Sequence, residues 1–279
     1  MVVQRSGGAG DVIMAIACFG NIIDTHPEAT FRTFPPFVDV ARAYLSPALI
    51  ATEELDEPTS LDLDGVYESM WQLGHPTPPL VAFCQAAGCP VPSTYPRPYI
   101  SDDAVAWANG ILEGNPHPKI AVGFWSDRQC VMWDINRWIE LFRLLPEYVF
   151  VLLHAHHLSE LPTRRGSVGS MAGEANVLDI TGQTNFNQML AAIQRCDLVI
   201  SIDTLHAHIA SSLGKPLIYL GGGHILSAPP GQAIIFKGQA SCYPCYATTD
   251  RECGPGPHCL GWVTSHMVAT TAKGSLENG

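Results

Sequence analysis

Short apolar runs alternate with longer amphipathic segments along the whole chain. Strands are predicted at "MVVQR" (1–5) and "ATFRTF" (29–34), and the segment between them carries its apolar residues on one side, as a helix does. A second series begins at "IAVGF" (120–124) and continues through "YVFVLLH" (148–154) and "DLVISI" (197–202). Strands separated by helices of about ten residues are typical of parallel sheets with right-handed crossovers. The pattern therefore predicts an α/β protein with two Rossmann-like domains.

The chain length and one proline-containing stretch set the expected domain boundary. A chain of 279 residues suits two ordinary domains, and "NPHPK" (115–119) is the best candidate for a linker. We expect domains at 1–114 and 119–272. The last residues, "KGSLENG" (273–279), are predicted to be a disordered or artificial tail. Further predicted helices are 37–45, 78–88, 101–114, 135–145 and 184–196, and further predicted strands are 48–52, 176–180, 217–222 and 233–236.

Composition and charge narrow the classes of partner. Hydrophobic residues make up 47% of the chain, charged residues only 15%, and the net charge is −11, with an acidic cluster at 52–68. This balance argues against a nucleic-acid backbone or an anionic lipid surface as the main partner. No apolar run reaches the roughly 20 residues that span a bilayer. Glycines at 7–10 interrupt any signal-peptide pattern, so we expect a cytoplasmic protein without a transmembrane segment.

The segment "SIDTLHAHIASSLG" carries the first candidate site. A buried strand ends there, Asp203 is the expected N-cap of a short helix, and Gly214 is its expected stop. Thr204 and His208 are spaced i and i+4 and share a face near the helix N-terminus. Together with free backbone N–H groups, these side chains can converge on an anion. A plain N-cap with a solvent-facing histidine is an equally good interpretation of the spacing.

Two other stretches carry weaker signals. "GGAGDV" follows the first strand, but Ile13 stands where the dinucleotide fingerprint has its third glycine, so Asp11 as a helix N-cap alone is the favoured interpretation without further context. The stretch "FWSDRQCVMW" (124–133) follows a strand end and can touch a ligand. An ordinary surface loop is slightly favoured for it.

The nine cysteines fall into two groups. Four are clustered with the spacing C-x2-C-x7-C-x5-C: Cys242, Cys245, Cys253 and Cys259. This spacing favours one tetrahedral thiolate site for zinc or a single iron, with a structural role because no open position is implied; two disulfides or free thiols are the alternative. The others are expected to be small core residues of a reduced protein: Cys18, Cys84, Cys89, Cys130 and Cys196.

Three stretches in this order resemble glycosyltransferase family 9, the ADP-heptose glycosyltransferases (heptosyltransferases). They are the N-terminal "GGAGDVIMAI", the run from "DITGQT" through "DLVISIDTLHAH" to "SLGKP", and the late "CYPCYATTDRECGPGPHCL". The resemblance implies a GT-B fold, with two Rossmann-like domains facing across a cleft, the second one binding a nucleotide sugar. It implies inverting sugar transfer without a catalytic metal, from ADP-heptose or a related donor to a protein or saccharide hydroxyl, in a bacterial enzyme.

The same resemblance assigns roles to individual residues. Asp11 matches the aspartate that acts as general base on the acceptor hydroxyl. Asp203, Thr204 and His208 match the residues that hold the donor diphosphate and sugar, and Leu205 stands where the family has glycine. Arg128 is the cation available to neutralise the leaving diphosphate.

The resemblance leaves alternatives open. The family subset that glycosylates bacterial surface proteins and carries a cysteine-held iron is one candidate. Leu205, together with Val131 at a position that is commonly lysine, supports a second interpretation, namely a catalytically impaired GT-B protein that serves as a binding or assembly module. A UDP- or GDP-sugar donor is a third.

Overall fold

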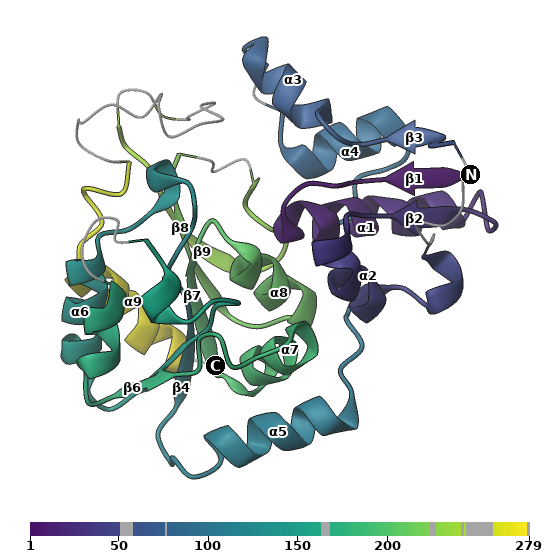
Figure 1. The fold of residues 1–279 in the computed structure, drawn as a ribbon. Coiled ribbons are helices and arrows are strands. Elements are labelled where there is room, and N and C mark those ends of the chain that lie inside the picture. Colours follow the sequence, from purple (N-terminus) through teal and green to yellow (C-terminus); the bar gives the residue numbers. More distant parts are fainter. Residues whose placement is uncertain are drawn as a thin grey trace. The chain divides into compact units, whose positions relative to one another are not determined.

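The computed structural model describes residues 1–50, 58–75, 77–162, 168–223, 227–240, 243 and 259–277 (Figure 1). The chain divides into two compact units, Met1–Tyr99 and Ile100–Gly279. Among the described helices, none is long and apolar enough to cross a bilayer.

The first unit is built on a small parallel sheet in the order β2–β1–β3. Its strands are β1 (Val2–Gln4), β2 (Thr30–Arg32) and β3 (Leu61–Asp62), and its helices are α1 (Ala9–Ile23), α2 (Val38–Tyr44), α3 (Val66–Gln72) and α4 (Pro79–Ala87). Short 3-10 turns occupy Pro35–Phe37 and Pro47–Leu49. Helix α1 packs against both α2 and α4, which explains why its apolar residues are buried around most of its circumference.

The second unit has a six-stranded parallel sheet in the order β6–β5–β4–β7–β8–β9. The strands are β4 (Lys119–Gly123), β5 (Val149–Leu152), β6 (Val177–Asp179), β7 (Leu198–Ile202), β8 (Leu217–Gly221) and β9 (Ala233–Lys237). The chain runs outward from β4 to β6, returns to place β7 beside β4, and then runs outward again. This is the doubly wound Rossmann order, which creates a switch point between β4 and β7 where such sheets bind ligands.

Helices cover both faces of this sheet (Figure 1). They are α5 (Asp102–Leu112), α6 (Ile135–Leu144), α7 (Phe186–Arg195), α8 (Leu205–Leu213) and α9 (Ser265–Glu277), with 3-10 turns at Gln129–Val131, Leu158–Glu160 and Val168–Gly173. Helices α6 and α9 pack together, as do α5 and α7. The core between α6, α9 and the sheet contains the buried indoles of Trp133 and Trp138.

Two sequence expectations are corrected at the level of elements. The predicted tail is helical as far as Glu277, because Val268, Ala269 and Ala272 of α9 are buried against the core. In the predicted strand 48–52, residue 49 ends a 3-10 turn and Ile50 forms a single bridge to β2, while the last two residues lie outside the described part.

The boundary between the units lies earlier in the chain than the expected linker at 115–119. Helix α5 packs on α7, and Ser101 donates from both its backbone N–H and its hydroxyl to Oδ1 of Asn187, so this helix belongs to the second compact unit. Ser101 is also the N-cap of α5, where its hydroxyl accepts from the N–H of Ala104. The functional division into domains at 1–114 and 119–272 stays a prediction.

Candidate functional site

The switch point of the second unit is formed by the turn after β7. The strand ends at Ile202, and α8 begins at Leu205 with Thr204 as its N-cap in extended conformation. The prediction that Asp203 is the N-cap is wrong, because Asp203 lies one residue before the cap. The side chain of the N-cap residue Thr204 makes no capping hydrogen bond to the first turn of α8. The first N–H groups of a helix have no partners within the helix and attract anions, and Asp203, Thr204 and Leu205 beside them are all partly exposed.

A chain of hydrogen-bonding groups fixes the conformation of this turn. Oγ of Ser201 lies 3.0 Å from Oγ1 of Thr204, which lies 3.2 Å from Nδ1 of His206. The Ser201 hydroxyl is also 2.8 Å from the carbonyl of Ile202, to which it donates. The i, i+4 spacing in the sequence predicted that Thr204 and His208 act together. In the structure the hydroxyl of Thr204 contacts the ring of His206 instead.

Gly123, at the end of β4, allows β7 and α8 to approach this closely. A Cβ at this position would lie 2.3 Å from Oγ of Ser201 and 2.9 Å from both Oγ1 of Thr204 and Cβ of His206. Real Cβ atoms do not come so near, so any side chain here would displace the turn. The sequence pattern predicts a strand at Gly123 but not this role, because the contact depends on a strand 78 residues later.

Both histidines of α8 are buried, which excludes the interpretation of a solvent-facing histidine. Burial and the nearby His154 lower the pKa of His206 to about 3, and burial lowers the pKa of His208 to about 4. At neutral pH both rings are uncharged. Any interaction they make with an anion is therefore a neutral hydrogen bond and not a charge pair.

The stretch 124–133 is not an ordinary surface loop. Most of its side chains belong to the hydrophobic core: Phe124, Trp125, Cys130, Val131, Met132 and Trp133. Asp127 is exposed at its apex, and Arg128 beside it is partly exposed. The backbone N–H of Arg128 donates to Oγ of Ser126 over 3.2 Å, and the carbonyl of Cys130 accepts from the N–H of Gly223, just after β8. The buried flanks thus anchor a short polar tip that begins directly after β4.

An aromatic pair lies beside this loop. The rings of Trp125 and His154 meet edge to face with centroids 5.3 Å apart, after β4 and β5 respectively. Trp125 is 8% exposed, and among the described residues its indole N–H has no hydrogen-bond partner. Burial lowers the pKa of His154. This pair therefore packs in the buried region that follows the ends of the adjacent strands β4 and β5.

In the first unit, Asp11 is the centre of a charged cluster. It lies in the first turn of α1, whose N-cap is Gly8, so the sequence-based interpretation of Asp11 as the N-cap is corrected. Its Oδ2 accepts from Nη2 of Arg5 over 2.9 Å and from the hydroxyl of Tyr67 over 3.2 Å. The Asp11 side chain is 18% exposed, so part of the carboxylate reaches solvent.

Arg5 holds three carboxylates together. It is 2% exposed, and it pairs with Glu68 at 2.8 Å and Asp64 at 3.5 Å as well as with Asp11. Its guanidinium lies over the rings of Tyr67 and Phe83, about 5 Å from each centroid. Burial alone lowers the pKa of Arg5, but the charges of the carboxylates outweigh it and the pKa is raised above its usual range.

The glycine turn after β1 is explained by this arginine. A Cβ on Gly7 would lie 2.5 Å from Nη2 of Arg5. The turn therefore needs glycine to let the backbone pass over the buried guanidinium. Two acidic residues of the cluster come from the acidic stretch 52–68, which the sequence analysis treated only as a source of negative charge.

The predicted four-cysteine site lies almost entirely outside the described residues. Cys242, Cys245 and Cys253 are not described, and Cys259 is buried at the start of the last described segment. This metal site stays a prediction.

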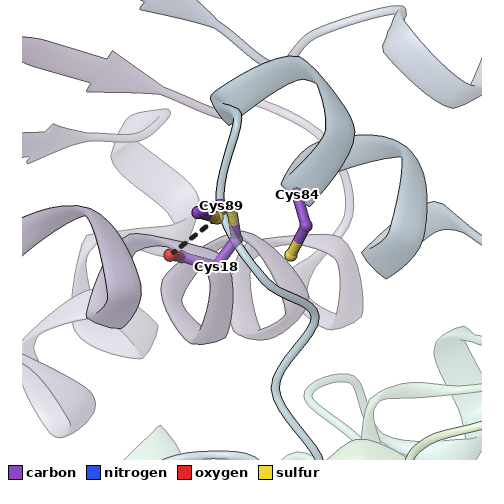
Figure 2. Close-up of side chains that lie close together, drawn as sticks. All are labelled: Cys18, Cys84 and Cys89. Atoms are coloured by element: carbon purple, nitrogen blue, oxygen red, sulfur yellow. Dashed lines mark hydrogen bonds between the residues drawn. The ribbon is translucent and has the colours of Figure 1, made fainter.

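Three other cysteines, expected to be scattered core residues, are brought together in the first unit. Their Sγ atoms lie within 4.8 Å of one another: Cys18, Cys84 and Cys89 (Figure 2). Contact with Cys84 and burial raise the pKa of Cys18, and contact with Cys18 lowers the pKa of Cys84. Cys18 and Cys89 are 71 residues apart, so spacing along the chain carries no signal of the group.

Comparison with known proteins gives one family and a consistent fold. Residues 80–253 match the family model described as glycosyltransferase family 9 (heptosyltransferase). Curated proteins give no match.

Among solved structures, the chain is similar to E. coli ADP-heptose lps heptosyltransferase II, with a TM-score of 0.64 at 14% identity over 99% of this chain and 98% of that one. It is also similar to a family 9 glycosyltransferase from Veillonella parvula, with a TM-score of 0.68 at 14% identity over 100% and 97%. A third is the iron-containing dodecameric glycosyltransferase TibC from enterotoxigenic E. coli, with a TM-score of 0.75 at 12% identity over 99% and 76%. These likenesses confirm the predicted α/β class and GT-B fold.

Proposed function

Because the chain belongs to glycosyltransferase family 9 (heptosyltransferase) and is a glycosyltransferase, we propose that it transfers a heptose or related sugar from ADP-heptose to a protein or saccharide hydroxyl. The donor is supported by two of the similar structures, a heptosyltransferase named for ADP-heptose and TibC in complex with ADP-D-β-D-heptose. The transfer is proposed to invert the configuration at the sugar carbon.

The observation that carries this proposal is the start of α8 at the switch point between β4 and β7, where the N-cap side chain of Thr204 makes no capping hydrogen bond. A diphosphate can accept hydrogen bonds from the first N–H groups of α8 and gains from the helix dipole. Asp203, Thr204, Leu205 and His208 are proposed to surround the donor there. Because the histidines of α8 are neutral, the helix start and Arg128 would supply the positive potential that the diphosphate needs.

Asp11 is proposed as the general base. In a single displacement, the acceptor oxygen attacks the anomeric carbon, its proton passes to the carboxylate, and the ADP oxygen leaves with the electron pair of the broken bond. Arg5 and Tyr67 both engage Oδ2 most closely, and Tyr67 lies 3.4 Å from Oδ1. They would hold the carboxylate in one orientation, and Oδ1, the oxygen they engage less closely, is proposed to accept the proton.

The replacement Asp11→Asn tests the base. The amide keeps the shape of the side chain but cannot take a proton, so we expect turnover to fall by about 10²-fold or more while ADP binding is unchanged. Sugar transfer and isothermal titration with ADP measure the two quantities. Asp39→Asn on exposed α2 is the matched control, and turnover of Asp11→Asn equal to that control would contradict the assignment.

The replacement Arg128→Ala tests the donor site. Loss of one charge-assisted contact to a diphosphate is expected to raise the Kd for ADP about tenfold. Arg195→Ala, on the exposed side of α7, is the control and should bind ADP as the unmodified protein does. Equal Kd values for the two variants would remove Arg128 from the site.

A binding or assembly module is the second candidate, supported by the loop after β4. Val131 is buried against Gly222, at a position where the resembling family commonly has lysine. A protein that binds ADP but shows no transfer to any protein or saccharide acceptor, and no hydrolysis of ADP-heptose, would be this module.

A structural metal at Cys242, Cys245, Cys253 and Cys259 remains part of the proposal. The name of TibC describes that protein as iron-containing. When Cys242 and Cys245 are both replaced by serine, we expect elemental analysis to find one metal ion per chain fewer than in the unmodified protein.

A further inference from the structure

The group formed by Cys18, Cys84 and Cys89 lies in the first unit and takes no part in the proposed transfer. Cys18 comes from the middle of α1, Cys84 from α4, and Cys89 from the residue after the glycine that ends α4 (Figure 2). Cys18 and Cys84 are buried, and Cys89 is partly exposed. Three soft ligand atoms therefore meet at a point with one side open to solvent.

The backbone at the end of α4 positions Cys89 for this meeting. Gly88 is in the left-handed conformation. The N–H of Cys89 donates to the carbonyl of Cys84 over 3.0 Å, and the N–H of Gly88 donates to the carbonyl of Gln85 over 3.2 Å. This is the hydrogen-bonding pattern of a Schellman turn, which folds the chain back along the helix it has just left. The side chain of Asn21 then holds the carbonyl of Pro90 at 2.7 Å and ties the turn to α1.

The spacing of the sulfur atoms fits the ligands of a single ion. Thiolates at about 2.3 Å from a tetrahedral zinc ion lie about 3.8 Å from one another. Sγ of Cys18 and Sγ of Cys89 are 3.6 Å apart, and all three sulfur atoms lie within 4.8 Å. Shifts of about 1 Å or less would bring every pair to the ligand spacing. A disulfide would join only two of the sulfur atoms, at about 2.05 Å, whereas a metal ion can bind all three.

We propose that Cys18, Cys84 and Cys89 bind one zinc ion as three thiolates, with water in the fourth position on the open side of Cys89. The three thiols release three protons as the ion binds, and no electron is transferred. The site would join α1 to α4 and its terminal turn. Such a cross-link suits a unit whose sheet has strands of only two or three residues, because metal binding then contributes directly to folding.

Metal content of the full chain tests the site. Protein refolded with zinc and freed of excess ion is analysed for metal per chain, beside Cys89→Ser and the control Cys196→Ser. Cys196 is buried in the second unit, where its thiol donates to the carbonyl of Ala192. We expect Cys89→Ser to carry one zinc less than the other two proteins. Equal zinc content in all three would overturn the proposal.

Labelling of the unmodified protein gives a second test that does not depend on the folding of a variant. Cys89 is partly exposed, so an alkylating reagent is expected to modify it only after a chelator has removed the ion, as peptide mapping would show. Cobalt(II) in place of zinc should give a near-ultraviolet thiolate charge-transfer band that Cys89→Ser weakens. Rapid alkylation of Cys89 in zinc-loaded protein, or a Cys18–Cys89 disulfide in protein purified under reducing conditions, would overturn the site.

The outcome is independent of the proposed transfer and of the predicted four-cysteine loop. The loop belongs to the second unit, and replacing Cys242 and Cys245 with serine leaves the difference of one zinc between the unmodified chain and Cys89→Ser intact. A chain that transfers no sugar would still give this difference if the three-thiolate site exists.

Discussion

The two units place opposite kinds of polar chemistry at the start of a helix. In the first unit, buried Arg5 faces the carboxylates of Asp11, Asp64 and Glu68. In the second unit, the turn before α8 is fixed by uncharged groups, the hydroxyls of Ser201 and Thr204 and the neutral ring of His206.

The two clusters suit the different roles proposed for them. A carboxylate held by one arginine among three acids keeps a fixed orientation, as the proposed base requires. The groups that fix the turn before α8 are uncharged, so they do not oppose the electrostatic potential of the helix start, as the proposed anion site requires. The stability of the first cluster depends on charge pairing, whereas the second depends on close packing and on histidines that stay neutral.

The largest effect is expected from Arg5→Met. Removing the cation leaves three partly buried carboxylates without the positive charge that pairs them, so the free energy of unfolding should fall by about 3 kcal/mol. Urea titration measures the loss. Arg42→Met removes an arginine whose exposed pair with Asp39 should contribute within about 1 kcal/mol. A loss for Arg5→Met no larger than for this control would show that the charged cluster does not stabilise the unit.

A smaller effect is expected from Gly123→Ala. The added methyl group must displace Ser201, Thr204 or His206, which should cost about 1–3 kcal/mol and weaken ADP binding. Gly110 lies within α5 with open space where a Cβ would go, so Gly110→Ala should raise stability by about 0.5–1 kcal/mol and leave ADP binding unchanged. Thermal unfolding and isothermal titration separate these outcomes. If Gly123→Ala behaves like Gly110→Ala, the close approach at the turn is not required.

The third effect is spread over several pH units and is the pH dependence of the stability of the second unit. The unfolded chain protonates its histidines near pH 6.5, whereas the pKa values of His206 and His208 in the folded chain are about 3 and 4. The contribution of these neutral rings to the free energy of unfolding is therefore fully present above about pH 6.5. It is lost as the pH falls from 6.5 toward the folded-state pKa values, by up to about 1.4 kcal/mol per pH unit for each histidine.

Unfolding free energies at several values between pH 7.5 and 5.0 measure this slope. His208→Asn should have a shallower slope than the unmodified protein, and His26→Asn, which replaces an exposed histidine, should keep the original one. Identical slopes for all three proteins would mean that His208 titrates normally in the folded state.

Sequence patterns predicted the elements that local physics determines. The strands and helices from β4 to β8 follow from apolar runs and caps within a few residues of one another. Helix α9 was missed because its buried face consists mainly of small residues, Val268, Ala269 and Ala272, which produce a weak amphipathic signal.

The parts of the site that the sequence could not predict depend on distant partners. Arg5 meets Glu68 across 63 residues, and Gly123 meets the turn at Ser201 only because β4 and β7 are neighbours in the sheet. The neutrality of His206 and His208 follows from complete burial, which the helical pattern did not reveal. The family resemblance indicated Asp11, but its contacts with Arg5 and Tyr67 depend on the folded chain.

The closure of the core around α6 has a consequence for synthesis on the ribosome. The indole N–H of Trp133 donates to the carbonyl of Val263, and Arg137 donates to the carbonyls of Leu260, Gly261 and Val263. Trp133 and its acceptor are separated by 130 residues, which take roughly 6–26 s to translate. During that delay the apolar layer of the nascent chain stays incomplete, and surface of this kind is prone to aggregation until the last residues are made.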